Sequence, residues 1–131
     1  MINILKEVAN LFVQKNLGVL GTDLFIDEMP EKPSNCAAIL ELPSAKYNPF
    51  AEASRRTIAI YTRAESSVKA RTRCWGLFDA VNDSTEDASC GFIKLNGKMY
   101  PYTCANTPHK VGKDTQGRVI FMFLMYIIYH D

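Results

Sequence analysis

The feature that most constrains this chain is an unbroken apolar run, Val119–Tyr129, which is bounded by Arg118 and His130. Four of its residues are β-branched, four are aromatic, and none is Gly or Pro, which is the composition of a β-strand. At about 3.3 Å per residue, one strand of this length extends on the order of 40 Å and is longer than most strands. A helix that spans a membrane needs about 20 apolar residues, so we interpret the run as a strand.

Both faces of this strand are apolar, because side chains alternate between the two faces and neither set contains a charged residue. One set is Val119, Phe121, Phe123, Met125, Ile127 and Tyr129, and the other is Ile120, Met122, Leu124, Tyr126 and Ile128. A strand of this kind requires burial on both sides. We therefore expect a helix over one face, anchored by Trp75 and Phe78, and self-association or a partner on the other.

The size of the chain indicates one globular domain over residues 1–131, and its charge limits the kinds of partner. A chain of 131 residues is long enough to bury a core, and its net charge of +1 argues against a surface built entirely for nucleic acid. Lys6, Glu7 and Asn10 interrupt the apolar N-terminal segment, which therefore does not read as a signal peptide. We expect a soluble, intracellular protein without a membrane segment.

The first half of the chain predicts a helix followed by strands. Residues 2–16 have helical spacing of apolar side chains, and Gly18 and Gly21 are expected to end that helix. A short strand is possible at Leu24–Ile26, before a segment with two prolines. Alternating apolar residues then predict strands at Cys36–Leu42 and Arg55–Arg63.

The second half predicts a helix, a hairpin and the long strand. Ser66 or Ser67 is expected to cap the helix, and the sequence then places apolar residues and one arginine at helical steps: Val68, Arg71, Cys74 or Trp75, Phe78 and Val81. Asn96-Gly97 favours a type I′ turn and therefore a hairpin of Cys90–Leu95 with Lys98–Tyr102. Because Pro101 lacks an N–H, the second arm is expected to lie at a sheet edge or to end near Pro101.

These elements predict an α+β fold, with a mainly antiparallel or mixed sheet and two helices packed on it. The expected order is α-β-β-α-β-β-β, and the short strand at Leu24–Ile26 would add one more. Between the hairpin and the long strand, Cys104–Gly117 is a polar segment that we expect to be a long loop. Loops of this length without structure of their own are often functional.

The helix that starts at Ser66 or Ser67 carries charges that oppose its own dipole, with cations in its first half. One interpretation is a solvated face. The other is a subunit interface in which a basic group meets an acidic group on the next copy, since head-to-tail contacts of this kind generate rings. The basic candidates are Arg55, Arg56, Lys69, Arg71 and Arg73, and the acidic candidates are Asp83, Glu86 and Asp87.

The residues that would carry catalysis or bind a metal are few. His109 and His130 are the two histidines, and we expect both to be surface or interface residues. The acidic segment around Asp83 lacks the spacing of a calcium loop, and no phosphate-binding glycine loop occurs. The cysteines, Cys36, Cys74, Cys90 and Cys104, lack zinc-site and redox-pair spacing and are expected to be reduced. We therefore expect no cofactor, no metal and no enzymatic activity.

The element order and several local patterns resemble the tail terminator (minor capsid or tail completion) proteins of long-tailed bacteriophages. The matching residues are the strand Thr57–Arg63, which leads directly into the helix Ser67–Val81, and Pro108 followed by Gly112–Arg118, which leads into the closing strand. The resemblance covers nearly the whole chain in architecture. No individual binding residue is transferred by it.

The resemblance implies a structural subunit of the virion tail or neck that forms a ring, usually a hexamer. Such a ring caps the tail tube, ends its polymerisation and joins the tail to the head connector. The implied partners are further copies of the chain, the tail tube protein and a head completion protein, with no sequence-specific nucleic acid, although DNA would pass through the ring. Candidate contacts with neighbouring rings are the acidic turn at 83–87 and the loop residues Asn106, Pro108, His109, Lys110, Gly112, Lys113 and Asp114.

Three alternatives remain open from the sequence. A head-tail joining protein would bind the ring on the portal side instead of the tube. A small hydrolase or nuclease would depend on His109 or on the carboxylates of residues 83–87. A module that binds a host factor would use the loop before the long strand.

Overall fold

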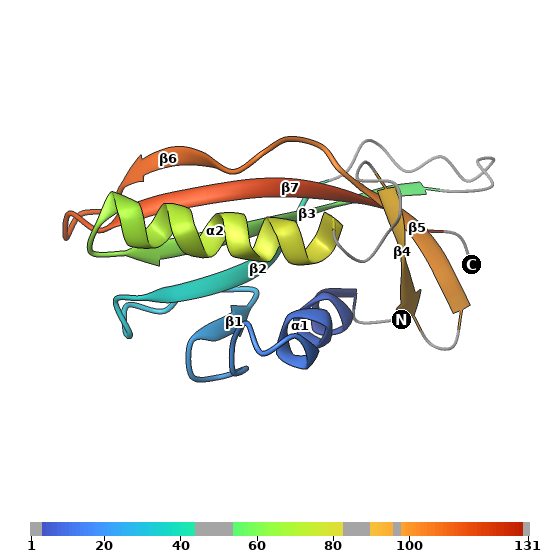
Figure 1. Cartoon of the computed structure of the whole chain (residues 1–131), viewed down its shortest axis with the longest axis horizontal. Helices are drawn as coiled ribbons and strands as arrows, with labels where there is room; N and C mark the ends of the chain where they lie inside the picture. Colours follow the sequence, from blue (N-terminus) through green and yellow to red (C-terminus); the bar gives the residue numbers. More distant parts are fainter. Residues whose placement is uncertain (1–3, 44–53, 83–89, 96–97, 130–131) are drawn as a thin grey trace.

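The computed structural model describes residues 4–43, 54–82, 90–95 and 98–129 (Figure 1). In these ranges the elements are α1 (Ile4–Gln14), β1 (Leu24–Ile26), β2 (Cys36–Leu42), β3 (Ser54–Ala64), α2 (Ser67–Asn82), β4 (Cys90–Leu95), β5 (Lys98–Cys104), β6 (His109–Lys113) and β7 (Val119–Tyr129). The α+β prediction is confirmed, including the short strand β1 and the strand over the apolar run.

The strands form one mixed sheet of seven strands in the order β1-β2-β3-β7-β5-β4, with β6 also paired to β7. β1 is parallel to β2, and the other pairs are antiparallel. β7 pairs with β3 along its full length on one side, and on the other side it pairs first with β6 and then with β5. The apolar run is thus the central strand of the sheet.

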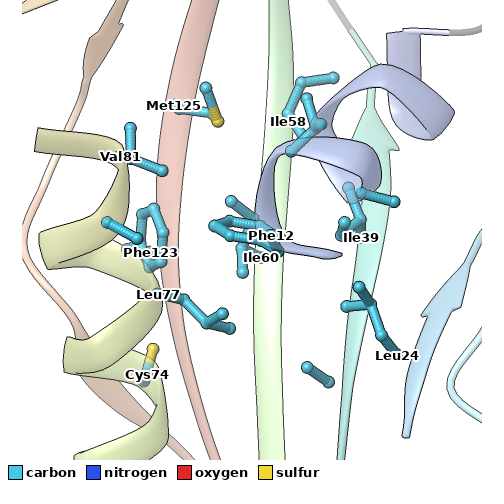
Figure 2. Packing of buried hydrophobic residues seen from close by; sticks show 14 of the residues in the cluster. Phe12, Leu24, Ile39, Ile58, Ile60, Cys74, Leu77, Val81, Phe123 and Met125 are labelled. Carbon is cyan, nitrogen blue, oxygen red and sulfur yellow. The ribbon is translucent and has the colours of Figure 1, made fainter. Parts of the chain in front are cut away.

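Both helices pack on the same face of the sheet and enclose one hydrophobic core (Figures 1 and 2). The residues Val119, Phe121, Phe123, Met125 and Ile127 of β7 are buried there. Phe12 of α1, Leu77 of α2, Ile60 of β3 and Phe123 of β7 belong to this core (Figure 2). The prediction of a helix over one face of the long strand is confirmed.

The other face of β7 is less covered in the described part of the molecule. Ile120, Met122, Leu124, Tyr126 and Ile128 are each half-buried. Towards the start of β7, Arg63 of β3 lies opposite Ile120 on this face, and Arg63 and Arg118 donate hydrogen bonds to carbonyl groups of the connection between β1 and β2. The two apolar faces of the strand therefore have different environments within one subunit.

The rotation of α2 about its axis differs from the prediction. The buried residues of α2 are Ala70, Cys74, Leu77, Ala80 and Val81, of which Cys74 and Val81 were on the predicted stripe, whereas Val68, Arg71 and Trp75 are exposed. Ala70 lies close enough to β3 for its carbonyl oxygen to accept a hydrogen bond from the buried Thr62 hydroxyl at 2.9 Å. Small side chains permit this close approach, which selects the stripe with Ala70 and Cys74 for the core.

The predicted anchors of α2 are therefore only partly correct. Phe78 is half-buried and packs edge-to-face on Phe123, with a centroid distance of 5.3 Å. Trp75 is 38% exposed and packs on Phe78, not on the sheet, with a centroid distance of 5.4 Å. Ser66 caps the helix as expected, because its Oγ accepts a hydrogen bond from the Lys69 N–H at 3.2 Å.

The end of α1 was assigned to the wrong residues. The helix stops at Gln14, and Asn16 takes a positive φ of 59°. The Leu17 N–H donates to the Phe12 carbonyl at 3.0 Å and the Asn16 N–H donates to the Val13 carbonyl at 3.1 Å. These bonds form a Schellman motif, in which Asn16 takes the left-handed position that glycine usually occupies.

The segment Cys104–Gly117 is not a loop without structure, because β6 lies within it. Four of its five residues are paired in register with Val119–Met122 of β7, and the register is irregular between Lys110 and Gly112. The strand β5 also continues beyond Pro101 and pairs with β7 from Tyr102 onwards, so it is not an edge strand. Pro101 lies just before this two-sided part, opposite Phe92 of β4. Its missing N–H is therefore tolerated.

The predicted pairing of the hairpin arms is confirmed. The predicted turn Asn96-Gly97 lies outside the described residues.

Candidate functional site

The two basic residues at the start of β3 occupy different environments. Arg56 forms a two-pronged ion pair with Glu41 of β2, in which Nε and Nη2 each lie 2.5 Å from a carboxylate oxygen. Both side chains are about one quarter exposed. The Arg55 guanidinium instead lies 4.1 Å from the centroid of the Tyr126 ring. Arg56 is thus used within the subunit, whereas Arg55 is exposed on the less covered face of the sheet.

The three basic residues of α2 point to opposite sides of the helix. Arg73 turns towards β1, where its Nη2 donates to the Asp23 carbonyl at 3.0 Å and lies 3.7 Å from the Asp23 carboxylate. Arg71 turns towards β7 and lies over the Phe121 ring at 5.6 Å. Lys69 is exposed on the flank that Arg73 occupies, because residues four apart share one side of a helix.

The predicted basic group is therefore dispersed. Arg55 lies at the start of β3 and Lys69 lies in the helix that follows its end, so a strand of this length separates them by on the order of 30 Å. Asp83, Glu86 and Asp87, the predicted acidic counterpart, lie outside the described residues. Two of the predicted interface residues, Arg56 and Arg73, form ion pairs within the subunit. The other three, Arg55, Lys69 and Arg71, are exposed.

The candidate partner loop combines structural and exposed residues. The side-chain oxygen of Asn106 accepts a hydrogen bond from the Leu124 N–H at 2.8 Å. Pro108 is buried, and His109 is exposed with its Nδ1 3.1 Å from the Thr107 carbonyl oxygen. Lys110 and Lys113 are exposed on β6, on either side of Gly112, which has a φ of 153°. His109, Lys110 and Lys113 thus remain accessible for a partner.

Asp114 organises the turn from β6 to β7. Its Oδ1 accepts hydrogen bonds from the N–H groups of Gln116 and Arg118, each at 2.9 Å, and its Oδ2 accepts one from the Arg118 Nε at 2.7 Å. Desolvation alone would raise the pKa of this carboxyl group. The hydrogen bonds from Arg118 and Gln116 and the Arg118 charge outweigh it and hold the pKa below its ordinary value.

Two buried arginines hold the segment between β1 and β2, and the sequence did not reveal this arrangement. Arg118 joins the segment to this turn, and Arg63 joins it to β3. The Arg63 Nη2 donates to the carbonyl oxygens of Pro30, Pro33 and Glu31 at 2.6, 2.8 and 3.2 Å, and its Nε donates to that of Ser34 at 3.3 Å. The Arg118 Nη1 donates to the Glu31 carbonyl at 2.5 Å. The signal available in the sequence was an arginine near the end of one predicted strand, Arg63, and an arginine directly before the long apolar strand, Arg118.

The described residues contain no group of three or more His, Cys, Asp and Glu side chains that would hold a metal ion. Cys36, Cys74 and Cys104 are free thiols. Burial raises the pKa of Cys74 and of Cys104 to about 11, so both thiols are protonated at neutral pH. No helix in the described ranges is long and apolar enough to cross a membrane.

Comparisons with known proteins bear on this architecture. A protein-family model described as "Bacteriophage tail terminator protein" matches residues 13–131. A chain in a solved structure of the virion of a native gene transfer agent particle superimposes with a TM-score of 0.63 at 11% identity, covering 98% of this chain and 95% of that chain. A second solved chain, described only by an identifier, gives a TM-score of 0.55 at 10% identity, with 98% and 99% covered. At these identities the two structures share the fold. A search of curated proteins gave no match.

Proposed function

The chain belongs to the bacteriophage tail terminator family and is a structural component of the virion, and from this premise we propose that it forms a homo-oligomeric ring that caps the tail tube. The ring, with six subunits as the family resemblance implies, ends polymerisation of the tube and joins the tail to the head connector. The observation that carries the proposal is the family match, which spans residues 13–131 and so includes every strand of the sheet.

The packing of β7 supports association with other proteins of the virion. The half-buried set Ile120, Met122, Leu124, Tyr126 and Ile128 presents apolar and aromatic side chains on the sheet face opposite the helices. Contiguous exposed apolar surface commonly marks a protein interface. A subunit that packs against tube or connector proteins would bury such a surface.

The proposal is tested first on the purified protein. Native mass spectrometry and negative-stain microscopy, with and without tail tube protein, are expected to show closed rings that bind to the ends of tubes. A protein that stays monomeric and does not bind tubes in any condition would contradict the proposal.

The role at the tube end is tested in particles that lack the protein. Overlong tails without heads are expected, because tube growth would continue without a cap. Tails of normal length without heads would contradict the capping role and would indicate a head-tail joining protein.

A further inference from the structure

The exposed large apolar residues of the described chain are concentrated at two opposite edges of the sheet. Apart from Met99 on β5, they fall into one group beside β1 and another beside β6. Figure 1 shows β1 with α1 along one margin of the sheet and β6 along the opposite margin, with α2 crossing between them. Each group is accompanied by charges of one predominant sign.

We name the first group the acidic edge, which consists of Val13, Val19, Leu20, Asp27 and Glu28. Leu20 forms a bridge to Leu24 at the outer side of β1, and Asp27 directly follows β1, where its N–H donates to the Ile39 carbonyl at 3.0 Å. Asp27 and Glu28 are both exposed. Lys15, the lysine at the end of α1, is directed towards α2 because its Nζ donates to the Ala80 carbonyl at 2.7 Å.

We name the second group the basic edge, which consists of Val68, Arg71, Trp75, Lys110, Val111 and Lys113. On α2, the residues Val68, Arg71 and Trp75 share one flank because they are spaced by three and four positions. Arg73 on the opposite flank reaches Asp23 beside β1. The flank that carries Arg71 therefore points towards β7 and β6.

The lysines of β6 project on the same side of the sheet as this flank. Lys110 is paired with Phe121 and Lys113 with Val119, and residues directly opposite one another in a sheet share a face. Phe121 and Val119 belong to the face covered by the helices. Arg71 lies over Phe121, so the two lysines and Arg71 are on the same side of the sheet. The acidic residue on this flank, Asp79, lies one turn beyond Trp75, towards the far end of α2.

We propose that the acidic edge of one subunit binds the basic edge of the next copy of this chain. The two edges match in chemistry, since each combines three exposed apolar residues with exposed charges and the charges have opposite sign. They lie on opposite sides of one sheet, so the contact is head-to-tail and each subunit uses both edges. The inference rests on the proposed ring, for which it names the contact surfaces.

The pairing of backbone groups between subunits is disfavoured at these edges, which leaves side chains to make the contact. β1 has three residues, and β6 is short, irregular in register and contains two lysines. Short, bulged and lysine-rich strands are the features by which sheets avoid edge-to-edge pairing. Apolar side chains and complementary charges are therefore the contacts that these edges provide.

The test uses two charge-reversed full-length variants. Lys110→Glu with Lys113→Glu reverses the basic edge, and Asp27→Lys with Glu28→Lys reverses the acidic edge. Each variant alone is expected to lose the ring mass in native mass spectrometry and to appear as a folded monomer, because like charges then face one another. Lys69→Glu, on the other flank of α2, is the control and is expected to keep the ring.

Mixing the two variants in equal amounts distinguishes this contact from general effects of charge. In a mixed ring, one junction pairs two unchanged edges and the next pairs two reversed edges, so both junctions are attractive and the ring is expected to return. All changed residues are exposed, and Trp75 fluorescence with circular dichroism verifies folding.

The possible outcomes separate the inference from the proposed function. Rings formed by both variants on their own, or no ring on mixing, would overturn the edge contact while leaving the proposed ring intact. A wild-type chain that never self-associates would overturn both. Rings that depend on these charges but do not bind tube ends would support the edge contact and overturn the capping role.

Discussion

The side-chain oxygen of Asn106 lies 2.8 Å from the backbone nitrogen of Leu124 and accepts its hydrogen bond. The neighbouring Ala105 N–H donates to the Leu124 carbonyl at 2.8 Å. Leu124 falls between the stretch of β7 that pairs with β6 and the stretch that pairs with β5. The side-chain oxygen of Asn106 thus takes the place of the backbone carbonyl oxygen that would accept the Leu124 hydrogen bond if a neighbouring strand were paired there.

Replacing Asn106 with Ala is expected to destabilise the fold by about 1 kcal/mol, the typical net contribution of one hydrogen bond. Hydrogen exchange of the Leu124 amide should accelerate, and urea denaturation gives the change in the free energy of unfolding. Asn106→Asp keeps an acceptor oxygen and should preserve the protection of that amide. Unchanged exchange at Leu124 in the Ala variant would show that the bond does not protect it.

Two adjacent isoleucines test the difference between the faces of β7. Ile127 is fully buried under the helices, whereas Ile128 on the other face is half-buried. Ile127→Ala is expected to cost about 2–5 kcal/mol of unfolding free energy, as large-to-small changes in cores do. Ile128→Ala, the same chemical change, should cost distinctly less in the monomer. Equal losses in chemical denaturation would argue against the assignment of the two faces.

Arg63 is expected to resist conservative replacement. Its guanidinium donates to the carbonyl oxygens of four residues, and the ammonium group of lysine has neither the fork geometry nor the reach to satisfy them. Arg63→Lys should therefore lower the free energy of unfolding by about 1–3 kcal/mol, the cost of leaving buried polar groups unsatisfied. Limited proteolysis should then cleave between β1 and β2 more readily.

Arg55→Lys is the matched control, because Arg55 is exposed on the same strand. It should leave both stability and the rate of cleavage nearly unchanged. An equal effect of the two replacements would mean that the contacts of Arg63 do not stabilise this connection.

The lowered pKa of Asp114 predicts that the difference in stability between the wild type and a variant without this carboxyl group depends on pH. Because the pKa of its carboxyl group is lower in the folded protein, its ionised form stabilises the fold above the unfolded pKa of about 3.9, and this contribution is lost as the pH falls through the folded pKa. The wild type should therefore be more stable than Asp114→Asn at pH 6, and the gap should narrow below pH 4. Thermal denaturation across this range measures the gap, and a constant gap would contradict the assignment.

The sequence predicted those elements whose information is local. The composition of Val119–Tyr129 predicted the central strand, helical periodicity predicted the position of α1, and the turn signal Asn96-Gly97 predicted both arms of the hairpin. The long strand also indicated that one of its faces would lie under a helix, which the core confirms. These features depend on side chains close together in the chain.

The sequence did not predict β6, and it predicted the buried stripe of α2 only in part: Cys74 and Val81 are buried as expected, whereas Val68, Arg71 and Trp75 are exposed. Nothing in His109–Lys113 resembles a strand by composition, and the segment is ordered because it lies beside the unpaired side of β7. On α2, apolar residues occur around much of the helix, so periodicity allowed more than one buried stripe. The contact between Thr62 and Ala70 shows how close approach to β3 selected one of them.

By itself, the sequence determined an α+β subunit organised around one long apolar strand, because hydrophobic pattern and local backbone preferences are written along the chain. The tertiary structure decided which residues are available to a partner. It places Arg56 and Arg73 in contacts within the subunit and buries Pro108, while it leaves Lys110 and Lys113 exposed at one edge of the sheet and Asp27 and Glu28 at the other. The physical reason is that exposure depends on packing between segments distant in sequence, which no local pattern specifies.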